Sequence, residues 1–181
     1  MRVISGKAGG RRLKSRNNLD VRPTQDRVKE AVFNILAPVI YEKSVLDLFA
    51  GFGGLGLEAV SRGASEAVLV ERDYKNAKII KENTSICDFE DRVSVEVEDV
   101  FGFLKMGNKS FDIIFMDPPY KRGLVEKALI EVVKNNVLAE EGYIVAEQHK
   151  DELVPDIVEL NCIKKKEYGS TRIVFMEKGE D

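Results

Sequence analysis

The sequence predicts a single α/β domain in which a mostly parallel sheet is covered by helices on both faces. Short apolar runs typical of strands alternate with amphipathic runs typical of helices from residue 44 to residue 147. Most of the strand-like runs are apolar along their length, as in parallel strands buried on both faces. The chain has 181 residues, 44% of them hydrophobic, and no repeat or linker divides it, which fits one domain with its own core.

Residues 1–22 are predicted to form a basic extension to a core that spans residues 23–181. The stretch "RVISGKAGGRRLK" is typical of a hairpin of two short strands around a Gly-rich turn. "RPTQDRVKEAVFNILAP" then predicts a helix that Thr24 caps and that Pro38 ends. The apolar residues of this helix follow the spacing of one buried face: Val28, Ala31, Val32, Ile35 and Leu36.

The remaining elements alternate along the chain. The expected strands are "SVLDLF", "AVLVE", "RVSVEVE", "FDIIFM" and "GYIVAE". The expected helices are "LGLEAVSRG", "NAKIIKENTSI", a short one near residues 100–106, and "LVEKALIEVVKNNVL". The tail adds strand-like runs near residues 157–167 and in "TRIVFM", which makes seven strands. Because no long helix separates the last two, we expect an antiparallel strand at one edge of the sheet.

The charge of the chain is unevenly distributed. Residues 1–29 hold nine basic and two acidic residues, a net charge of +7, and the remainder carries −10 within a total of −3. A basic arm on an acidic body indicates a polyanionic partner such as nucleic acid. Charge alone is equally compatible with a solvated surface.

The sequence favours a reducing cytoplasmic compartment. Cys87 and Cys162 lie far apart and form no metal-type pair. No apolar run approaches the roughly 18 residues that span a membrane, and the N-terminus lacks the apolar region of a secretory signal. Its scarcity of acids is also compatible with an organelle transit peptide.

A glycine pattern marks the first candidate site. In "VLDLFAGFGGLGLE", Gly51, Gly53 and Gly56 fit G-x-G-x-x-G between a predicted strand and a predicted helix. Glycines there permit a tight turn and let a ligand approach the backbone beside a helix N-terminus. The stretch therefore predicts a nucleotide-like cofactor; a tight turn without a ligand is the alternative.

Four acidic residues follow predicted strands. The carboxyl ends of parallel strands meet at one edge of the sheet, so Asp47, Glu71, Asp99 and Asp117 are expected to converge there. After the glycine loop, the position of Glu71 favours a role in accepting the ribose hydroxyls of a nucleotide-like ligand; a solvated acid at a strand end is the alternative. Asp99 is placed to hold the exocyclic amine of an adenine, or only to cap the next helix.

The stretch "FMDPPYKRG" ends a buried strand with an acid, two prolines and a tyrosine. Proline fixes its own φ and restricts the preceding residue, so Asp117 and Tyr120 are predicted to lie in a rigid extended turn. Beside the other strand ends, this turn positions the Asp117 carboxylate at the cofactor. The alternative is a rigid turn with a structural role only.

Together these motifs resemble those of class I S-adenosylmethionine-dependent methyltransferases, which have a Rossmann-like fold. "DLFAGFGGLG" is similar to their cofactor loop, and "DPPY" to the motif of those that methylate exocyclic amines. The resemblance is closest to the RsmD family, which methylates N2 of a guanine in 16S ribosomal RNA: "RVISGKAGGRRL", "RPTQDRVKEAVFNIL", "MDPPY" and "YGSTRIVFM" stand in its order and spacing. Phe52 departs from the small Ser usual in the family, and we expect it to crowd the methionine end of the cofactor.

The resemblance implies roles for residues of this chain. The Asp117 carboxylate and the Pro118 carbonyl are expected to accept hydrogen bonds from the two N2 hydrogens of a flipped guanine, on which Tyr120 stacks. The residues implied for S-adenosylmethionine are Asp47, Phe49, Ala50, Gly51, Gly53, Gly56, Glu71, Arg72, Asp99, Val100 and Asp117. The residues expected to bind RNA are Arg11, Arg12, Lys14, Arg16, Arg22, Thr24 and Arg27.

The expected partner is 16S rRNA within a small ribosomal subunit or an assembly intermediate. The protein is expected to be a cytoplasmic monomer without a metal, with S-adenosylhomocysteine as its cofactor product.

Three alternative functions stay open. A nicotinamide-dependent oxidoreductase leaves "DPPY" unexplained. An adenine-N6 or protein-amine methyltransferase keeps the cofactor and changes the acceptor. A non-enzymatic RNA-binding assembly factor has no use for an intact cofactor loop beside "DPPY".

Overall fold

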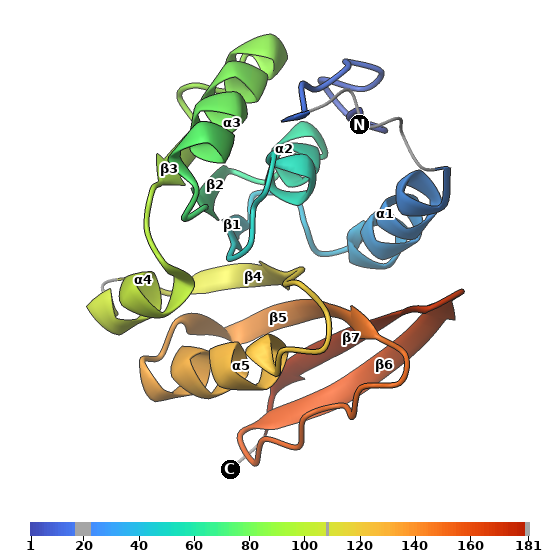
Figure 1. Ribbon diagram of the computed structural model, residues 1–181, viewed down its shortest axis with the longest axis vertical. Helices are drawn as coiled ribbons and strands as arrows, with labels where there is room; N and C mark the ends of the chain where they lie inside the picture. The colour runs from blue at the N-terminus through green and yellow to red at the C-terminus, as the bar shows by residue number, and fades with distance from the viewer. Residues whose placement is uncertain (17–22, 108, 180–181) are drawn as a thin grey trace.

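The fold is known from a computed structural model that describes residues 1–16, 23–107 and 109–179. Seven strands form one sheet in the order β3-β2-β1-β4-β5-β7-β6 (Figure 1). The strands are β1 (Ser44–Asp47), β2 (Glu66–Val70), β3 (Val93–Glu96), β4 (Phe111–Met116), β5 (Leu138–His149), β6 (Leu160–Tyr168) and β7 (Thr171–Lys178). The helices are α1 (Pro23–Leu36), α2 (Gly54–Ser61), α3 (Tyr74–Cys87), α4 (Val100–Met106) and α5 (Leu124–Lys134). The predicted α/β class and mostly parallel sheet are confirmed.

The antiparallel pairing lies at one edge of the sheet, as expected. Strands β1 to β5 are parallel, but β7 runs antiparallel between β5 and β6, so the outermost strand is β6. Residues of β7 from Ile173 to Met176 are buried, whereas most of β6 is exposed and carries three consecutive lysines. The more apolar strand therefore takes the inner position, and the polar strand forms the edge.

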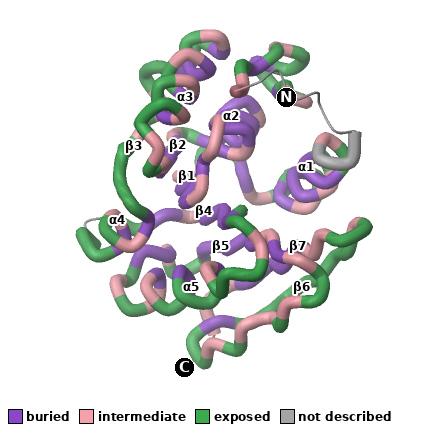
Figure 2. Tube along the Cα trace, viewed as in Figure 1, coloured by how far each residue is buried: buried purple, intermediate pink, exposed green. Residues whose placement is uncertain are grey.

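The helices divide the core between the two faces of the sheet. On one face α1, α2 and α3 pack over residues such as Val45 and Ile113. On the other face α4 and α5 pack over the next residues along the same strands, Leu46 and Ile114. Figure 2 shows buried residues concentrated in the central strands and on the inner sides of the helices. Burial on both faces is the physical reason that these strands are apolar along their length.

The N-terminal segment forms a short antiparallel hairpin, as expected. Arg2 and Arg12 make its antiparallel bridge, the Val3 N–H donates to Arg11 O at 3.0 Å, and the Gly10 N–H donates to Val3 O at 2.9 Å. The turn of the hairpin is bonded to α2, because Lys7 N–H donates to the Ser61 carbonyl at 2.8 Å and Ala8 N–H to its hydroxyl at 3.0 Å. The hairpin is therefore fixed to the core through α2.

The buried carboxylate of Glu58 in α2 anchors the same segment. Its two oxygens accept the N–H groups of Ile4 at 2.7 Å and Ser5 at 3.1 Å. They also pair with Lys29 of α1 at 3.2 Å and with Arg62 at 2.7 Å. A buried carboxylate is stable only when it is paired and hydrogen-bonded, so Glu58 joins the N-terminal segment, α1 and α2 into one network.

Two predicted helix limits are wrong. The first helix begins at Pro23, so Thr24 lies inside the first turn and is not its N-cap; proline is pre-organised for the first helical position. The last helix ends at Lys134 rather than residue 138, because Asn136 adopts a positive φ of 52° and β5 starts at Leu138. In the described part of the chain, no helix is long and apolar enough to cross a membrane.

Candidate active site

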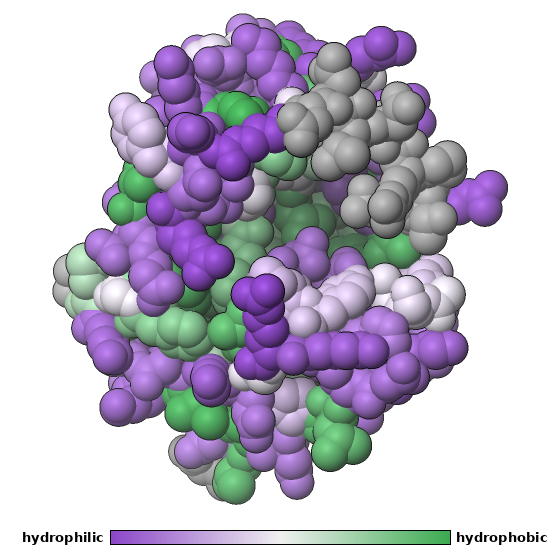
Figure 3. Space-filling view, in the orientation of Figure 1, coloured by the Kyte–Doolittle hydropathy of each residue, from purple (hydrophilic) through white to green (hydrophobic). Residues whose placement is uncertain are grey.

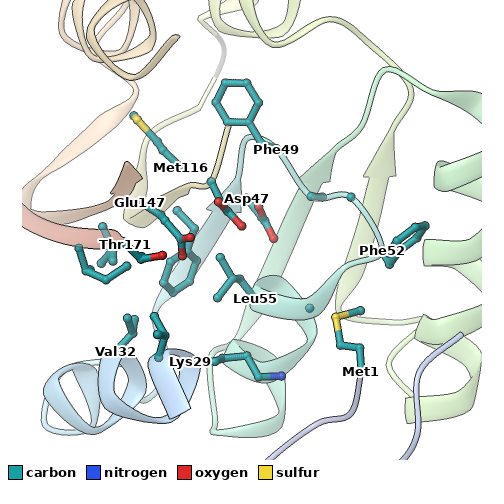
Figure 4. Close-up of a pocket in the computed structure, with 18 of the residues that line it drawn as sticks. Met1, Lys29, Val32, Asp47, Phe49, Phe52, Leu55, Met116, Glu147 and Thr171 are labelled. Carbon is teal, nitrogen blue, oxygen red and sulfur yellow. The ribbon is translucent and has the colours of Figure 1, made fainter. Parts of the chain in front are cut away.

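A cavity of about 490 Å³ opens where the carboxyl ends of the central strands meet α1 and the N-terminal segment. The hollow is visible in Figure 3, with apolar residues in its floor. Its walls come from the loop after β1, from the ends of β4 and β5, from the start of β7, and from α1 (Figure 4). This is the edge at which open α/β sheets bind their ligands.

The glycine loop forms the first wall. Gly51 and Gly53 have φ values of +56° and +85°, a backbone region that favours glycine. Gly56 faces Leu69 of β2, and a Cβ at this position would lie 2.7 Å from the Leu69 Cδ1 atom. Glu71 accepts the Gly51 N–H at 3.0 Å. The glycines thus provide the turn and the close packing of α2 on β2.

Asp47 contributes a buried carboxylate to this wall. Its Oδ2 accepts the Gly56 N–H at 3.1 Å, whereas its Oδ1 is buried without a hydrogen-bond partner among the described residues. Burial raises the pKa of Asp47 to about 7. Figure 4 shows the Asp47 carboxylate at the cavity. An unpaired buried oxygen at a cavity fits a ligand that brings a hydrogen-bond donor or a positive charge.

Asp117 stands on the second wall, directly after β4. It is exposed and lines the cavity. Reduced hydration of its carboxylate by the surrounding protein, and to a smaller extent the nearby Glu147 and Asp47, raises the pKa of Asp117 to about 8. Pro118 behind it is buried. The strand therefore ends where the sequence predicts, and Asp117 places a carboxylate at the cavity.

Glu147 and Thr171 belong to the same wall, and the sequence interpretation missed both. Tyr120 donates its O–H to Glu147 Oε1, and its oxygen lies 2.9 Å from the Thr171 hydroxyl. Burial of the Tyr120 ring raises its pKa, and burial also raises that of Glu147. The signal for Glu147 was its position at the carboxyl end of the strand in "GYIVAE"; nothing local marks Thr171.

Only part of the predicted site lines the cavity. The predicted residues that do so are Asp47, Phe49, Ala50, Gly51 and Asp117. Those outside its lining are Gly53, Gly56, Glu71, Arg72, Asp99, Val100, Pro118 and Tyr120. Asp99 is exposed and caps α4 by accepting the Phe101 N–H at 3.0 Å, which agrees with the structural alternative for this residue.

Phe52 lines the cavity. Its ring points away from Asp47 and Glu147 (Figure 4), and its carbonyl accepts a hydrogen bond from Asn83 Nδ2 at 2.9 Å. That Phe52 crowds the methionine end of the cofactor stays a prediction.

The basic arm is less free than the sequence suggests. Arg11 pairs with Asp88 at 2.6 Å, Lys14 with Glu82 at 2.8 Å and Arg16 with Asp73 at 2.8 Å, so the arm is held along α3. Arg12 and Arg27 are exposed and make no ion pair within the described residues. Arg22 and the side chain of Thr24 lie outside what the structure describes.

Comparison with known proteins agrees with this architecture. A family model described as Conserved hypothetical protein 95 matches residues 1–177. Ribosomal RNA small subunit methyltransferase D of Escherichia coli (strain K12) is 37% identical over 157 residues, covering 87% of this chain and 79% of that protein. The protein of the same name from Haemophilus influenzae is 37% identical over 173 residues, covering 93% and 89%. The solved structure of yhhF from Escherichia coli has a TM-score of 0.89 and 31% identity, and covers 98% of this chain and 97% of that chain.

The seven-stranded sheet with a reversed β7, and the glycine loop after β1, define a class I methyltransferase. Within this class the chain belongs to the RsmD family of S-adenosylmethionine-dependent rRNA methyltransferases. The cavity fits such a cofactor. Asp47, Asp117 and Glu147 give it an acidic lining, and its one lysine, Lys29, pairs with Glu58. The sulfonium and ammonium groups of S-adenosylmethionine are positively charged. Among the described residues, no cluster of histidines, cysteines and acids has the arrangement of a metal site.

Proposed function

We propose that this protein methylates the exocyclic N2 of a guanine in 16S rRNA, at the position called guanine 966 in this family. The observation that carries the proposal is the placement of Asp117 and the buried, unpaired Asp47 oxygen beside one cavity, at the carboxyl ends of the neighbouring strands β4 and β1. The Asp117 carboxylate, which would accept the guanine amine, thus lies next to Asp47, which would face the positively charged cofactor. The relatives named ribosomal RNA small subunit methyltransferase D support small-subunit rRNA as the substrate.

In this proposal the loop after β1 binds the cofactor. Asp47 and the loop from Phe49 to Gly51 hold S-adenosylmethionine, which supplies an electrophilic methyl group. The glycine N-terminal to α2 lets the cofactor approach the backbone closely. Glu71 holds the Gly51 N–H in the structure and reaches the ribose from the end of β2.

Asp117 acts on the acceptor. The lone pair of a guanine amine is delocalised into the ring, so the amine is a weak nucleophile. The Asp117 carboxylate and the Pro118 carbonyl accept the two N2 hydrogens, which directs the lone pair outward and increases electron density on nitrogen. After transfer the nitrogen is acidic, and Asp117 or water takes its proton. Tyr120, whose hydroxyl is fixed by Glu147 and Thr171, holds its ring still for stacking on the flipped base.

The substrate is rRNA in the cytoplasm, presented within a small ribosomal subunit or an assembly intermediate. Arg12 and Arg27 contact phosphates from exposed positions. The basic side chains of Arg11, Lys14 and Arg16, which form ion pairs along α3, contact phosphates after exchanging their carboxylate partners for them.

The test is methyl transfer from labelled S-adenosylmethionine to small subunits that lack the modification, with the product nucleosides identified by mass. We expect N2-methylguanosine with the wild-type protein and none with Asp117→Ala. Asp156→Asn, a change at an exposed acid away from the cavity, serves as the control. N6-methyladenosine as the product would replace the acceptor, and no transfer to subunits or free rRNA despite cofactor binding would refute the proposal.

A further inference from the structure

Glu147 stands beside Asp117 at the ends of two neighbouring strands. Met116 of β4 is paired in register with Ala146 of β5, so the next residues of both strands, Asp117 and Glu147, lie side by side. Neighbouring strands are about 4.8 Å apart. Met116 and Ala146 belong to the core on the α4 and α5 side, and side chains alternate along a strand. Asp117 and Glu147 therefore both point to the α1 side, where each lines the cavity.

Only one oxygen of the Glu147 carboxylate accepts a hydrogen bond from the described residues. Its Oε1 accepts the Tyr120 O–H, and this hydroxyl is in turn 2.9 Å from the Thr171 oxygen. No hydrogen-bond donor within the described residues reaches Oε2, and Glu147 makes no ion pair there. One oxygen is thus fixed by protein, and the Glu147 side chain lines the cavity (Figure 4). Burial raises the pKa of Glu147, and a second donor would stabilise its ionised form as the first does.

We propose that Glu147 determines the specificity for guanine by accepting the N1–H of the base whose N2 amine is held by Asp117. The inference rests on the proposed function, since it takes guanine as the acceptor. The N1–H and the N2 amine of guanine are neighbouring donors on one edge of the base. Two neighbouring carboxylates on one wall match these donors.

The same arrangement rejects bases with an acceptor at N1. Adenine and 2-aminopurine both present an N1 lone pair, which is repelled by a carboxylate oxygen and leaves that oxygen unpaired in a partly buried site. 2-Aminopurine keeps the C2 amine of guanine and lacks only O6 and N1–H. It therefore separates recognition of N1–H from the chemistry at N2.

A purely structural role for Glu147 makes a different prediction. If Glu147 only orients Tyr120, its replacement lowers the rate with either base by the same factor. Glu147→Gln separates the two roles. Its amide oxygen still accepts from Tyr120, and its NH₂ group replaces Oε2 as a donor that suits an N1 lone pair.

The experiment uses small subunits reconstituted with rRNA that carries either guanine or 2-aminopurine at the target position. We expect the wild-type kcat/KM to be about 10- to 100-fold higher with guanine. With Glu147→Gln we expect this preference to shrink by a similar factor or to reverse. Thermal shift with S-adenosylmethionine checks that the variant is folded and binds the cofactor.

The outcomes are distinguishable. Equal wild-type rates on the two bases would overturn the role of Glu147 and leave the proposed function intact. An equal loss on both bases in Glu147→Gln would overturn it in favour of the structural role. Wild-type inactivity on the guanine subunits would remove the proposed function together with this inference. If Glu147→Gln does not fold, equal wild-type rates on the two bases would still overturn the role of Glu147. Glu147→Asp then replaces Glu147→Gln, and loss of the guanine preference in this variant would support the role.

Discussion

The cofactor wall of the cavity, residues 47–56, is one continuous stretch of chain, whereas the acceptor wall joins the ends of β4 and β5 to the start of β7. The first wall depends on backbone shape: two glycines with positive φ and a third packed on Leu69. The second depends on side chains brought together by strand pairing: Asp117, Glu147 and Thr171. A change to one wall is therefore expected to alter cofactor affinity, and a change to the other to alter turnover or base choice.

The largest expected effect concerns Asp117 on the acceptor wall. Asp117→Ala is expected to lower kcat by about 1,000-fold or more, because it removes the carboxylate that orients the amine. Cofactor affinity is expected to change by less than about fivefold, since the cofactor wall is intact. Single-turnover rates and calorimetric titration with S-adenosylmethionine measure the two quantities. Parallel loss of both would mean that the walls are not separable.

Gly53 tests the cofactor wall, and Gly10 provides a matched control. Both have a φ near +85°, so an alanine costs each about 1–2 kcal/mol of backbone strain. At Gly53 the added Cβ would also lie 3.1 Å from Leu57 Cδ1, whereas nothing lies within 4 Å at Gly10. We expect Gly53→Ala to weaken cofactor binding about tenfold or more, and Gly10→Ala to leave it unchanged. Equal affinities in titrations of the two variants would argue against a role for loop shape.

The raised pKa of Asp47 predicts how stability without cofactor depends on pH. Its ordinary value is 3.8 and its folded value is about 7, so between these the folded state binds the proton that the unfolded state has lost. The Asp47 contribution to stability is therefore complete below about pH 4 and is lost as pH rises through 7. Asp47→Asn is expected to remove this part of the slope and to be more stable than wild type at pH 8, by on the order of 2 kcal/mol. Urea unfolding at pH 5 and pH 8 measures the free energy of unfolding of both proteins. The same change in this free energy between the two pH values for wild type and Asp47→Asn would contradict the assignment.

The smallest expected effect lies outside both walls, at Arg12. Arg12→Gln is expected to weaken rRNA binding about 2- to 5-fold at physiological salt and to lower the salt slope by about one counterion. The exposed Lys75 of α3 gives the control, Lys75→Gln. Filter binding over a range of salt concentrations provides both values. Unchanged affinity and slope would show that Arg12 is only a solvated surface residue.

The difference between the walls also explains what the sequence could predict. Gly51, Gly53 and "DPPY" act through local backbone geometry, and their spacing was enough to predict a tight loop after β1 and a carboxylate at the end of β4. Thr171 enters the site because β7 pairs with β5, with His149 opposite it, and no local pattern encodes that register. The anchoring of the N-terminal hairpin was missed for the same reason, since Glu58, the partner of Ile4, is 54 residues away.

Glu58 has a consequence for the order in which the protein folds during synthesis. The backbone of Ile4 and Ser5 leaves the ribosome early, yet its native partner, the Glu58 carboxylate, follows 54 and 53 residues later. That carboxylate is fully buried and in turn needs Lys29 and Arg62. The first residues of the nascent chain therefore stay without native structure until α2 has emerged.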